Sequence, residues 1–219
     1  MKHVRTAIIV TIFWTVAVGG IYPLFITGIG AIFFPRRAGG ELIASGGKVV
    51  GSELIGQEFT TERYFHSRPS AIHYDASSSG ASNQGYTSAA LKKDYEQRKS
   101  DWQKAFGPGE PPMEMLFASG SGLDPHISPQ AAEAQVSAVA AARHLSSDQA
   151  AQLLTLVKSH EEGPQLGFLG EPRVNVLELN LALDKTFPGY ARHEAHRMAG
   201  VARRAAVRGL RRQRPGFPL

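Results

Sequence analysis

The pattern of apolar positions divides the chain close to its start. From Thr6 to Pro35 no side chain is charged, and basic residues flank this stretch on both sides. A helix rises about 1.5 Å per residue, so residues 6–35 exceed the roughly 30 Å hydrocarbon core of a bilayer. The apolar region of a cleaved secretory signal is only about 7–15 residues long. The pattern therefore predicts an uncleaved transmembrane helix behind a short N-terminal tail of residues 1–5.

Two features of this predicted span bear on its surroundings. Pro23 has no amide hydrogen, so a backbone carbonyl one turn earlier must find another partner in lipid. Gly28 and Gly30 would let a neighbouring helix approach closely. A plain anchor and a helix packed against other membrane helices both stay open. Basic residues at the two ends nearly balance, and we expect the N-terminus in the cytoplasm and the main domain outside.

Residues 36–184 alternate short strand-like and helical patterns, which predicts a single soluble α+β domain. Residues 48–50 resemble a short strand. Residues 89–107 predict a solvated helix with Leu91, Tyr95, Trp102 and Phe106 near one face.

The C-terminal half of this domain carries the clearest helix signals. Ser128 and Pro129 fit the N-cap and first turn of a helix that ends near Arg143. Ser146 and Gln149 have the capping-box spacing, and Leu153, Leu154, Leu156 and Val157 would form the core face of that next helix. Together the two helices predict a helical hairpin. Four leucines, Leu177, Leu179, Leu181 and Leu183, alternate as in a strand, whereas Val174, Leu177 and Leu181 also fit a helix. We expect a strand over 173–176, as part of a small sheet, and a helix from about Leu177.

Charge is distributed unevenly, and this changes what the domain could bind. The net charge is +5, yet residues 185–219 hold nine Lys/Arg against one acid, while residues 37–184 hold twelve bases and eighteen acids. We expect residues 185–219 to be a basic, flexible tail. The acidic body argues against a nucleic-acid partner, which needs basic charge on the folded surface. The chain has no cysteine, so disulfides and thiol chemistry are excluded.

Polar turn residues gather in residues 67–70, 75–88 and 119–128, as connectors or as a polar contact surface. Asp124 and His126, with neighbouring serines, offer the residue types of a hydrolytic triad. Local clustering is no sign of a triad, because its members usually come from separate segments. We therefore assign no catalytic residue and keep a membrane-anchored extracytoplasmic hydrolase, using residues 119–128, as the alternative function. The scattered histidines form no metal-binding motif, so no metal or cofactor site is assigned.

Five segments, taken together, are similar to one known family. They are GSELIGQEF (51–59), YFHSRPSA (64–71), SGASNQG (79–85), ASGSGLDPHISPQAAEAQV (118–136) and LGFLGEPRVNVLELNLALD (166–184). In this order behind one N-terminal span, they resemble the C subunit of the bacterial Kdp potassium-transporting P-type ATPase. The match covers roughly residues 5–184. It departs at Ala81, Gln84, Tyr86 and Ala138, where the family usually has Gly, Leu, Pro and a basic residue.

The resemblance implies a single-pass subunit of the bacterial plasma membrane, non-catalytic by itself. Its partners would be a channel-like potassium-translocating subunit, an ATP-hydrolysing P-type subunit and the lipid bilayer. ATP and Mg²⁺ would belong to the complex, and potassium would be the transported ion. The implied role is to stabilise assembly and raise ATP affinity as a catalytic chaperone, or to cover the potassium entrance. The candidate partner-contact or loop-signature residues are Gln57, Arg68, Ser82, Asn83, Asp124, His126 and Asn175.

Overall fold

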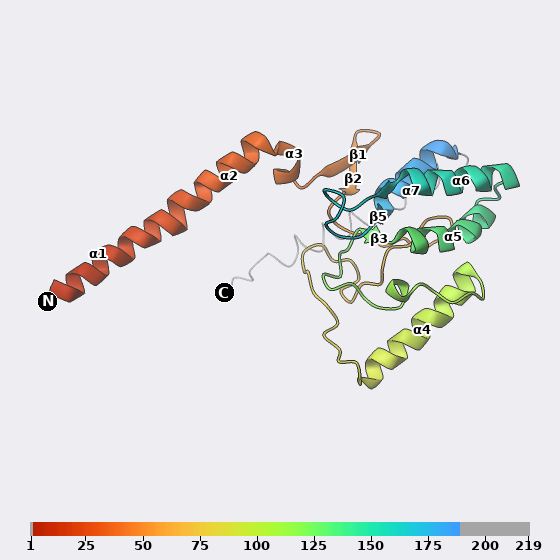
Figure 1. Ribbon diagram of the computed structural model, residues 1–219, viewed down its shortest axis with the longest axis horizontal. Coiled ribbons are helices and arrows are strands. Elements are labelled where there is room, and N and C mark those ends of the chain that lie inside the picture. Colours follow the sequence, from red (N-terminus) through yellow and green to blue (C-terminus); the bar gives the residue numbers. More distant parts are fainter. Residues whose placement is uncertain (1, 189–219) are drawn as a thin grey trace, which may run out of the picture. The chain divides into compact units, whose positions relative to one another are not determined.

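The computed structural model describes residues 2–188, which fall into two compact units that divide after Ile43 (Figure 1). The predicted C-terminal tail lies, from residue 189 onward, outside the described residues. Mixed helices and small sheets behind one long apolar helix confirm the predicted fold class. The division of the chain into a tail, a span, a domain and a second tail stays a prediction.

The first unit is dominated by a continuous helical rod, Lys2–Phe33, whose most apolar 18-residue stretch has a mean hydropathy of 2.0. It comprises α1 (Lys2–Val16), a π-helical turn η1 (Ala17–Ile21) and α2 (Tyr22–Phe33), followed by the short α3 (Pro35–Ala38). The helix thus begins before the stretch expected to span the membrane. By length and composition it is the one candidate membrane span among the described residues.

The π-helical turn lies directly before Pro23 and explains how the helix continues past that residue. Pro23 cannot donate the usual hydrogen bond and its ring crowds the preceding turn. The amide of Tyr22 instead donates to the carbonyl of Ala17, five residues back, which widens the turn. A local change of hydrogen-bond register therefore accommodates Pro23 without ending the rod.

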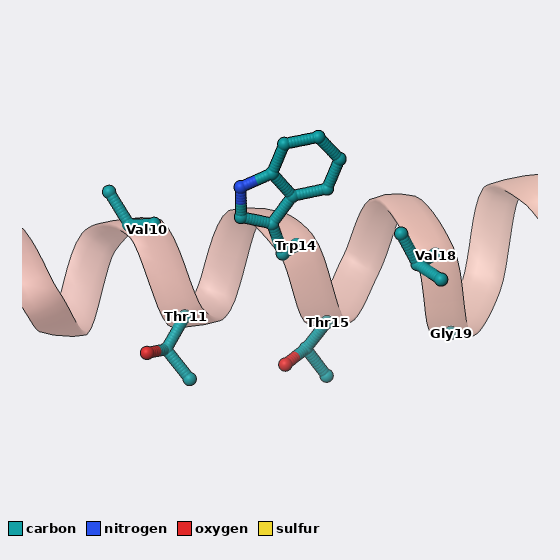
Figure 2. A pocket seen from close by; sticks show the side chains of 6 residues that line it. All are labelled: Val10, Thr11, Trp14, Thr15, Val18 and Gly19. Carbon is teal, nitrogen blue, oxygen red and sulfur yellow. The ribbon is translucent and has the colours of Figure 1, made fainter.

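A shallow groove along α1 is lined by small side chains on one side of the helix and by a tryptophan on the other. Figure 2 shows Thr11 and Thr15 on one side of the helix and Trp14 on the other; Val10, Val18 and Gly19 complete the lining. A side chain added at Gly19 would meet no atom within 4 Å. Thr11, Thr15 and Gly19 follow one another at four-residue spacing, which places small side chains on a common helix face.

The second unit has a layer of helices beside short strands. A two-stranded sheet pairs β1 (Leu42–Ser45) with β2 (Lys48–Ser52), where one unit follows the other in sequence. The helices are α4 (Ala89–Phe106), α5 (Pro129–Ala142), α6 (Ser147–Ser159) and α7 (Val176–Thr186), with a 3₁₀ turn η2 (Met113–Met115). In Figure 1, α5 lies between α4 and α6, and α7 lies beside α6.

The other sheet has the order β3–β5–β4 and is antiparallel throughout. Its strands are β3 (His126–Ile127), β4 (Glu161–Glu162) and β5 (Arg173–Asn175). In the register, His126 lies opposite Asn175, and both Ile127 and Glu161 lie opposite Val174. The central strand therefore links the loop before α5, the end of the helical hairpin and the start of α7.

Helix starts follow the sequence signals closely. Ser128 accepts from the Ala131 amide with Pro129 in the first turn, and Ser146 and Gln149 form a capping box. The helical hairpin is confirmed by packing of α5 on α6. The alternating leucines after residue 176 lie in a helix, because Asn175 caps α7 with its side-chain oxygen.

The core lies where α5, α6, α7 and β5 meet. Each large apolar side chain fully buried there contributes about 1.5–3 kcal/mol relative to exposure. The expected core face of α6 is only partly buried, since Leu153 and Val157 are enclosed while Leu154 and Leu156 stay partly exposed. The fully enclosed side chains include Phe65, Leu116, Ile127, Val139, Leu153, Val157, Val174, Val176, Leu179 and Leu183.

Candidate functional site

Three polar loops and the segment after β2 meet at what we call the loop junction, made of Gly56, residues 68–74, residues 79–80 and residues 119–126. Its centre is an ion pair in which Arg68 Nη1 lies 3.0 Å from Asp124 Oδ2. Both side chains are 27% exposed. The other carboxylate oxygen, Oδ1, accepts the His126 amide at 3.0 Å. Asp124 therefore ties two loops together and shapes its own turn, which is typical of an aspartate before proline.

Three backbone hydrogen bonds also join these loops to one another and to the segment after β2. The amide of Gly56 donates to Leu123 O at 2.8 Å, and the amide of Gly80 donates to Ser121 O at 2.9 Å. The amide of Ser119 donates to Pro69 O at 3.0 Å. Loops far apart in sequence thus satisfy one another's backbone groups without forming regular strands.

Two glycines are required by this close approach. A Cβ at Gly56 would collide with the backbone carbonyl of Asp124. Gly122 has a φ of +68°, and a side chain there would meet Ile72 and Gly80. Any larger residue would have to push one loop away from another, and at Gly122 it would also adopt a backbone conformation that L-residues rarely take.

The serine hydroxyls in and next to the junction serve the backbone. Ser70 Oγ donates to Gly122 O at 2.7 Å and accepts the Tyr74 amide at 3.0 Å. Ser121 Oγ accepts the Leu123 amide at 3.1 Å, and Ser128 Oγ caps α5. These contacts are typical of turns and helix caps. None of them places one of these three hydroxyls next to a base that could activate it as a nucleophile.

Electrostatics around His126 favour the neutral imidazole. Burial lowers its pKa from 6.5, and the nearby Arg173 cation lowers it further, while Asp124 opposes both effects. His126 Nδ1 lies 3.8 Å from Asp124 Oδ1, too long for a firm hydrogen bond. The pair therefore does not have the geometry of an oriented catalytic base.

The segment 63–67, which leads into the junction, is held by polar side chains of two helices. The amide of Asn180, on α7, brackets Phe65: its Oδ1 accepts Phe65 N and its Nδ2 donates to Phe65 O, both at 2.9 Å. Gln135, on α5, does the same for His66 at 2.7 and 3.2 Å. Both amide side chains are buried, at 2% and 0% exposure, and act as substitutes for a neighbouring strand.

A buried charge fixes the start of this segment. Arg143 Nε donates to Arg63 O at 2.7 Å, and its Nη2 lies 2.7 Å from Asp184 Oδ1. Tyr64 OH donates to the other Asp184 oxygen at 3.0 Å, and the guanidinium lies over the Tyr64 ring at 4.9 Å. The Arg143 side chain is fully buried, so loss of its carboxylate partner would leave an unpaired charge.

The structure brings together only some of the residues expected to form a contact surface. Arg68, Asp124 and His126 meet at the junction. Asn175 is buried, caps α7 and donates to Glu53 O at 2.8 Å. Gln57 donates to Val50 O at 3.0 Å.

The remaining two, Ser82 and Asn83, are exposed. Asn83 has a φ of +52°, and its side chain donates locally to Ala81 O at 3.3 Å. Gln84, one of the departures from the family pattern, donates to Asp94 of α4 at 3.4 Å. Contact of any of these residues with a partner stays a prediction.

Three structurally important residues escaped sequence reasoning: Gln135, Arg143 and Asn180. Their common signal is a polar residue set inside or at the end of an apolar helix face, as Gln135 is between Ala131 and Val139. Such a residue is usually hydrogen-bonded when buried, but its partner cannot be read from a helical pattern. Within residues 2–188, no three His, Asp or Glu side chains gather in a way that could hold a metal ion.

Together these features describe a protein with one candidate membrane span and a small α+β domain whose polar loops are joined to one another by hydrogen bonds. The family model described as K+-transporting ATPase, c chain (KdpC), matches residues 4–185. The chain is 48% identical to a potassium-transporting ATPase KdpC subunit of Koribacter versatilis, over 85% of this chain and 96% of the relative. KdpC subunits of Methylococcus capsulatus and Gemmatimonas aurantiaca are 48% and 50% identical, each over 84% of this chain and over 98% and 93% of the relative.

The chain belongs to the KdpC family, an accessory rather than catalytic subunit of the potassium-transporting ATPase. The predicted family is thus confirmed. The match ends at residue 185, so most of the basic tail lies beyond it.

Replacing Asn180 by Ala tests whether the amide bracket holds the segment 63–67. The change leaves the Phe65 amide and carbonyl buried without partners, at a cost of about 1–3 kcal/mol for each unsatisfied group. Thermal unfolding of the purified full chain in detergent should show a clear loss of stability, and hydrogen exchange at Phe65 should accelerate. The control is Gln97→Ala, which removes a side-chain amide from the exposed face of α4. An equal loss in both variants would contradict the role of Asn180.

The stability of the domain should fall as pH is lowered through about 6.5. Burial lowers the pKa of His66, so the unfolded chain binds a proton more readily than the folded one. Stability is then fully present above the unfolded pKa of 6.5 and is lost as the pH falls towards the folded pKa. His66→Gln should flatten this dependence in unfolding experiments between about pH 7.5 and 5, whereas exposed His3→Gln should not. An unchanged slope in His66→Gln would contradict the assignment.

Proposed function

We propose that this chain is a non-catalytic subunit that stabilises assembly of a potassium-uptake complex. Its partners are a channel-like potassium-translocating subunit and an ATP-hydrolysing P-type subunit. The observation that carries the proposal is the loop junction, where the family-signature segments are joined around Arg68 and Asp124. A set of loops fixed by mutual hydrogen bonds presents a rigid polar surface, and a rigid surface loses little entropy when a partner binds.

The large domain lies on the outer face of the membrane, where it partly covers the potassium entrance. Exposed hydroxyl and amide side chains of residues 77–83 suit brief contact with a hydrated cation. The acidic body helps to attract potassium, although exposed charges are screened beyond about 8 Å at physiological salt. Potassium is the transported ion, and ATP and Mg²⁺ are bound by the partner.

Support for ATP affinity follows from coupling between subunits. A domain outside the membrane cannot contact cytoplasmic ATP. It can favour one conformation of its partners only if its contacts differ between their two states. The small-residue face that runs from α1 into η1, with Thr11, Thr15 and Gly19, supports packing of the span on other membrane helices and offers a route for that coupling.

The alternative, a hydrolase acting through residues 119–128, is disfavoured by geometry. Both Asp124 oxygens and the hydroxyls of Ser121 and Ser128 have structural partners. None of these contacts pairs a serine hydroxyl with the His126 ring, as a hydrolytic triad would require.

Breaking the ion pair at the centre of the loop junction should reduce the yield of the complex. In Asp124→Ala the guanidinium of Arg68 loses its carboxylate and the 124–126 turn loses its cap. We expect at least a severalfold drop in the partner subunits recovered when the tagged chain is purified in mild detergent. Growth at limiting potassium should fall in parallel. Glu96→Ala on the exposed face of α4 is the matched loss of one carboxylate and should change neither readout.

The same experiment separates the two functions. Asp124→Ala and His126→Ala would abolish turnover with assembly intact if the loop were hydrolytic. Recovery of the unaltered chain without larger membrane partners would count decisively against an assembly subunit.

The orientation of the domain should be visible to a protease. If residues 44–188 lie outside, protease added to spheroplasts should degrade the domain and leave the membrane-embedded helix. Inverted vesicles should protect it. Protection in spheroplasts would place the domain inside, and ATP affinity would then have to be re-examined as a direct contact.

A further inference from the structure

Residues 163–170, here called the apolar loop, present large apolar side chains to solvent. The loop connects β4 to β5. Leu166 is 83% exposed, Phe168 73% and Leu169 49%. Single exposed apolar residues are ordinary on protein surfaces, but three within four positions form a patch that usually marks an interaction site.

The apolar loop is held in one conformation by its own backbone. Gln165 and Leu169 exchange both amide–carbonyl bonds, at 2.8 and 2.9 Å. The amide of Gly167 also donates to Pro164 O at 3.0 Å. Leu166 has a φ of +54°, a conformation that bulky residues rarely adopt and that these bonds enforce. The exposed side chains are therefore displayed on a pre-ordered support, which reduces the entropy lost on binding.

The charged residues that flank the apolar loop indicate whether its partner is a lipid surface or a protein. No residue from 163 to 170 is charged, whereas Glu161, Glu162 and Glu171 flank the loop. Arg173, the base that follows them in β5, is paired with Glu162 at 2.9 Å. Basic residues draw a surface to anionic lipid, so an acidic border disfavours insertion into a bacterial bilayer. The same border favours a protein surface with cationic residues around an apolar pocket.

We infer that the apolar loop docks into an apolar pocket with a cationic rim on another protein subunit of the potassium-transporting complex. The inference rests on the proposed assembly function and adds the surface through which this domain would bind. Phe168 and Leu166 are the anchors, because buried aromatic and aliphatic side chains at the centre of an interface carry most of its binding energy. The flanking glutamates fix the orientation of the domain.

Site-specific photo-crosslinking in the intact complex tests this contact. A photoreactive benzoylphenylalanine is placed at Phe168 in the tagged full chain, and at Met113, which is 66% exposed and lies outside the polar loops, as the control position. Irradiation of native membranes should give an adduct from position 168, but not from 113, with a subunit that also co-purifies with the unaltered chain. Peptide sequencing by mass spectrometry should place the adduct beside apolar residues with Lys or Arg nearby.

Two other outcomes overturn the inference and can be told apart. If the complex co-purifies intact while position 168 gives only lipid adducts or none, the apolar loop does not bind a subunit and the assembly function stands. If the unaltered chain is recovered alone, the assembly function fails and the inference fails with it.

Substitutions give a second, quantitative readout. Leu166→Ser combined with Phe168→Ser should reduce the recovered partner subunits about tenfold or more, as expected for loss of interface anchors. Met113→Ser, at a site 66% exposed and outside the polar loops, should leave recovery unchanged. Thermal unfolding of the isolated full chain should be unaltered in both, since all three side chains are exposed. Full recovery of the complex with the double variant would overturn the inference.

Discussion

The structure of the second unit depends on how the backbone groups of one segment find hydrogen-bond partners without a strand beside it. Residues 63–67 run through the core, where unpaired backbone groups are costly. Two buried side-chain amides, Asn180 and Gln135, bracket Phe65 and His66. The Arg143 guanidinium, at the end of α5, donates to the carbonyl that begins the segment. These side chains come from α5 and α7. Both helices therefore hold the segment in place, and the same hydrogen bonds join the two helices through it.

That arrangement positions the loops on the far side of the segment. Arg68 follows directly after it and reaches Asp124, while Pro69 and Ser70 exchange hydrogen bonds with residues 119–122. The loop 119–126 is in turn fixed to the start of α7, since the Val176 amide donates to Pro125 O at 3.0 Å. The polar surface of this domain is therefore a direct extension of its core, and a chain that assembles with others can present it without prior ordering.

Membership of the KdpC family places this architecture in a potassium-transporting ATPase, where a subunit without its own reaction must act through contacts. The described residues fit such a part. The buried side-chain amides of Gln135, Asn175 and Asn180 bond within the domain, and the exposed apolar loop is closed by backbone hydrogen bonds between Gln165 and Leu169. The π-helical turn shortly before Pro23 changes the hydrogen-bond register of the apolar rod, with the Tyr22 amide donating to Ala17 O. Each of these features fixes the shape of one part of the chain.

Much of the fold could be predicted from sequence because its signals are local. An uncharged run longer than a bilayer core, Ser128 before Pro129, and the Ser146–Gln149 capping box each act within one helix or one turn. The segments that carry the family resemblance include the loops that meet at the loop junction. Only the tertiary structure decided how those loops are joined, because hydrogen bonds such as that between Arg68 and Asp124 connect positions far apart in the chain. Helical periodicity marks polar exceptions on α5 and α7 but cannot name their partners, which only the folded path of residues 63–67 supplies.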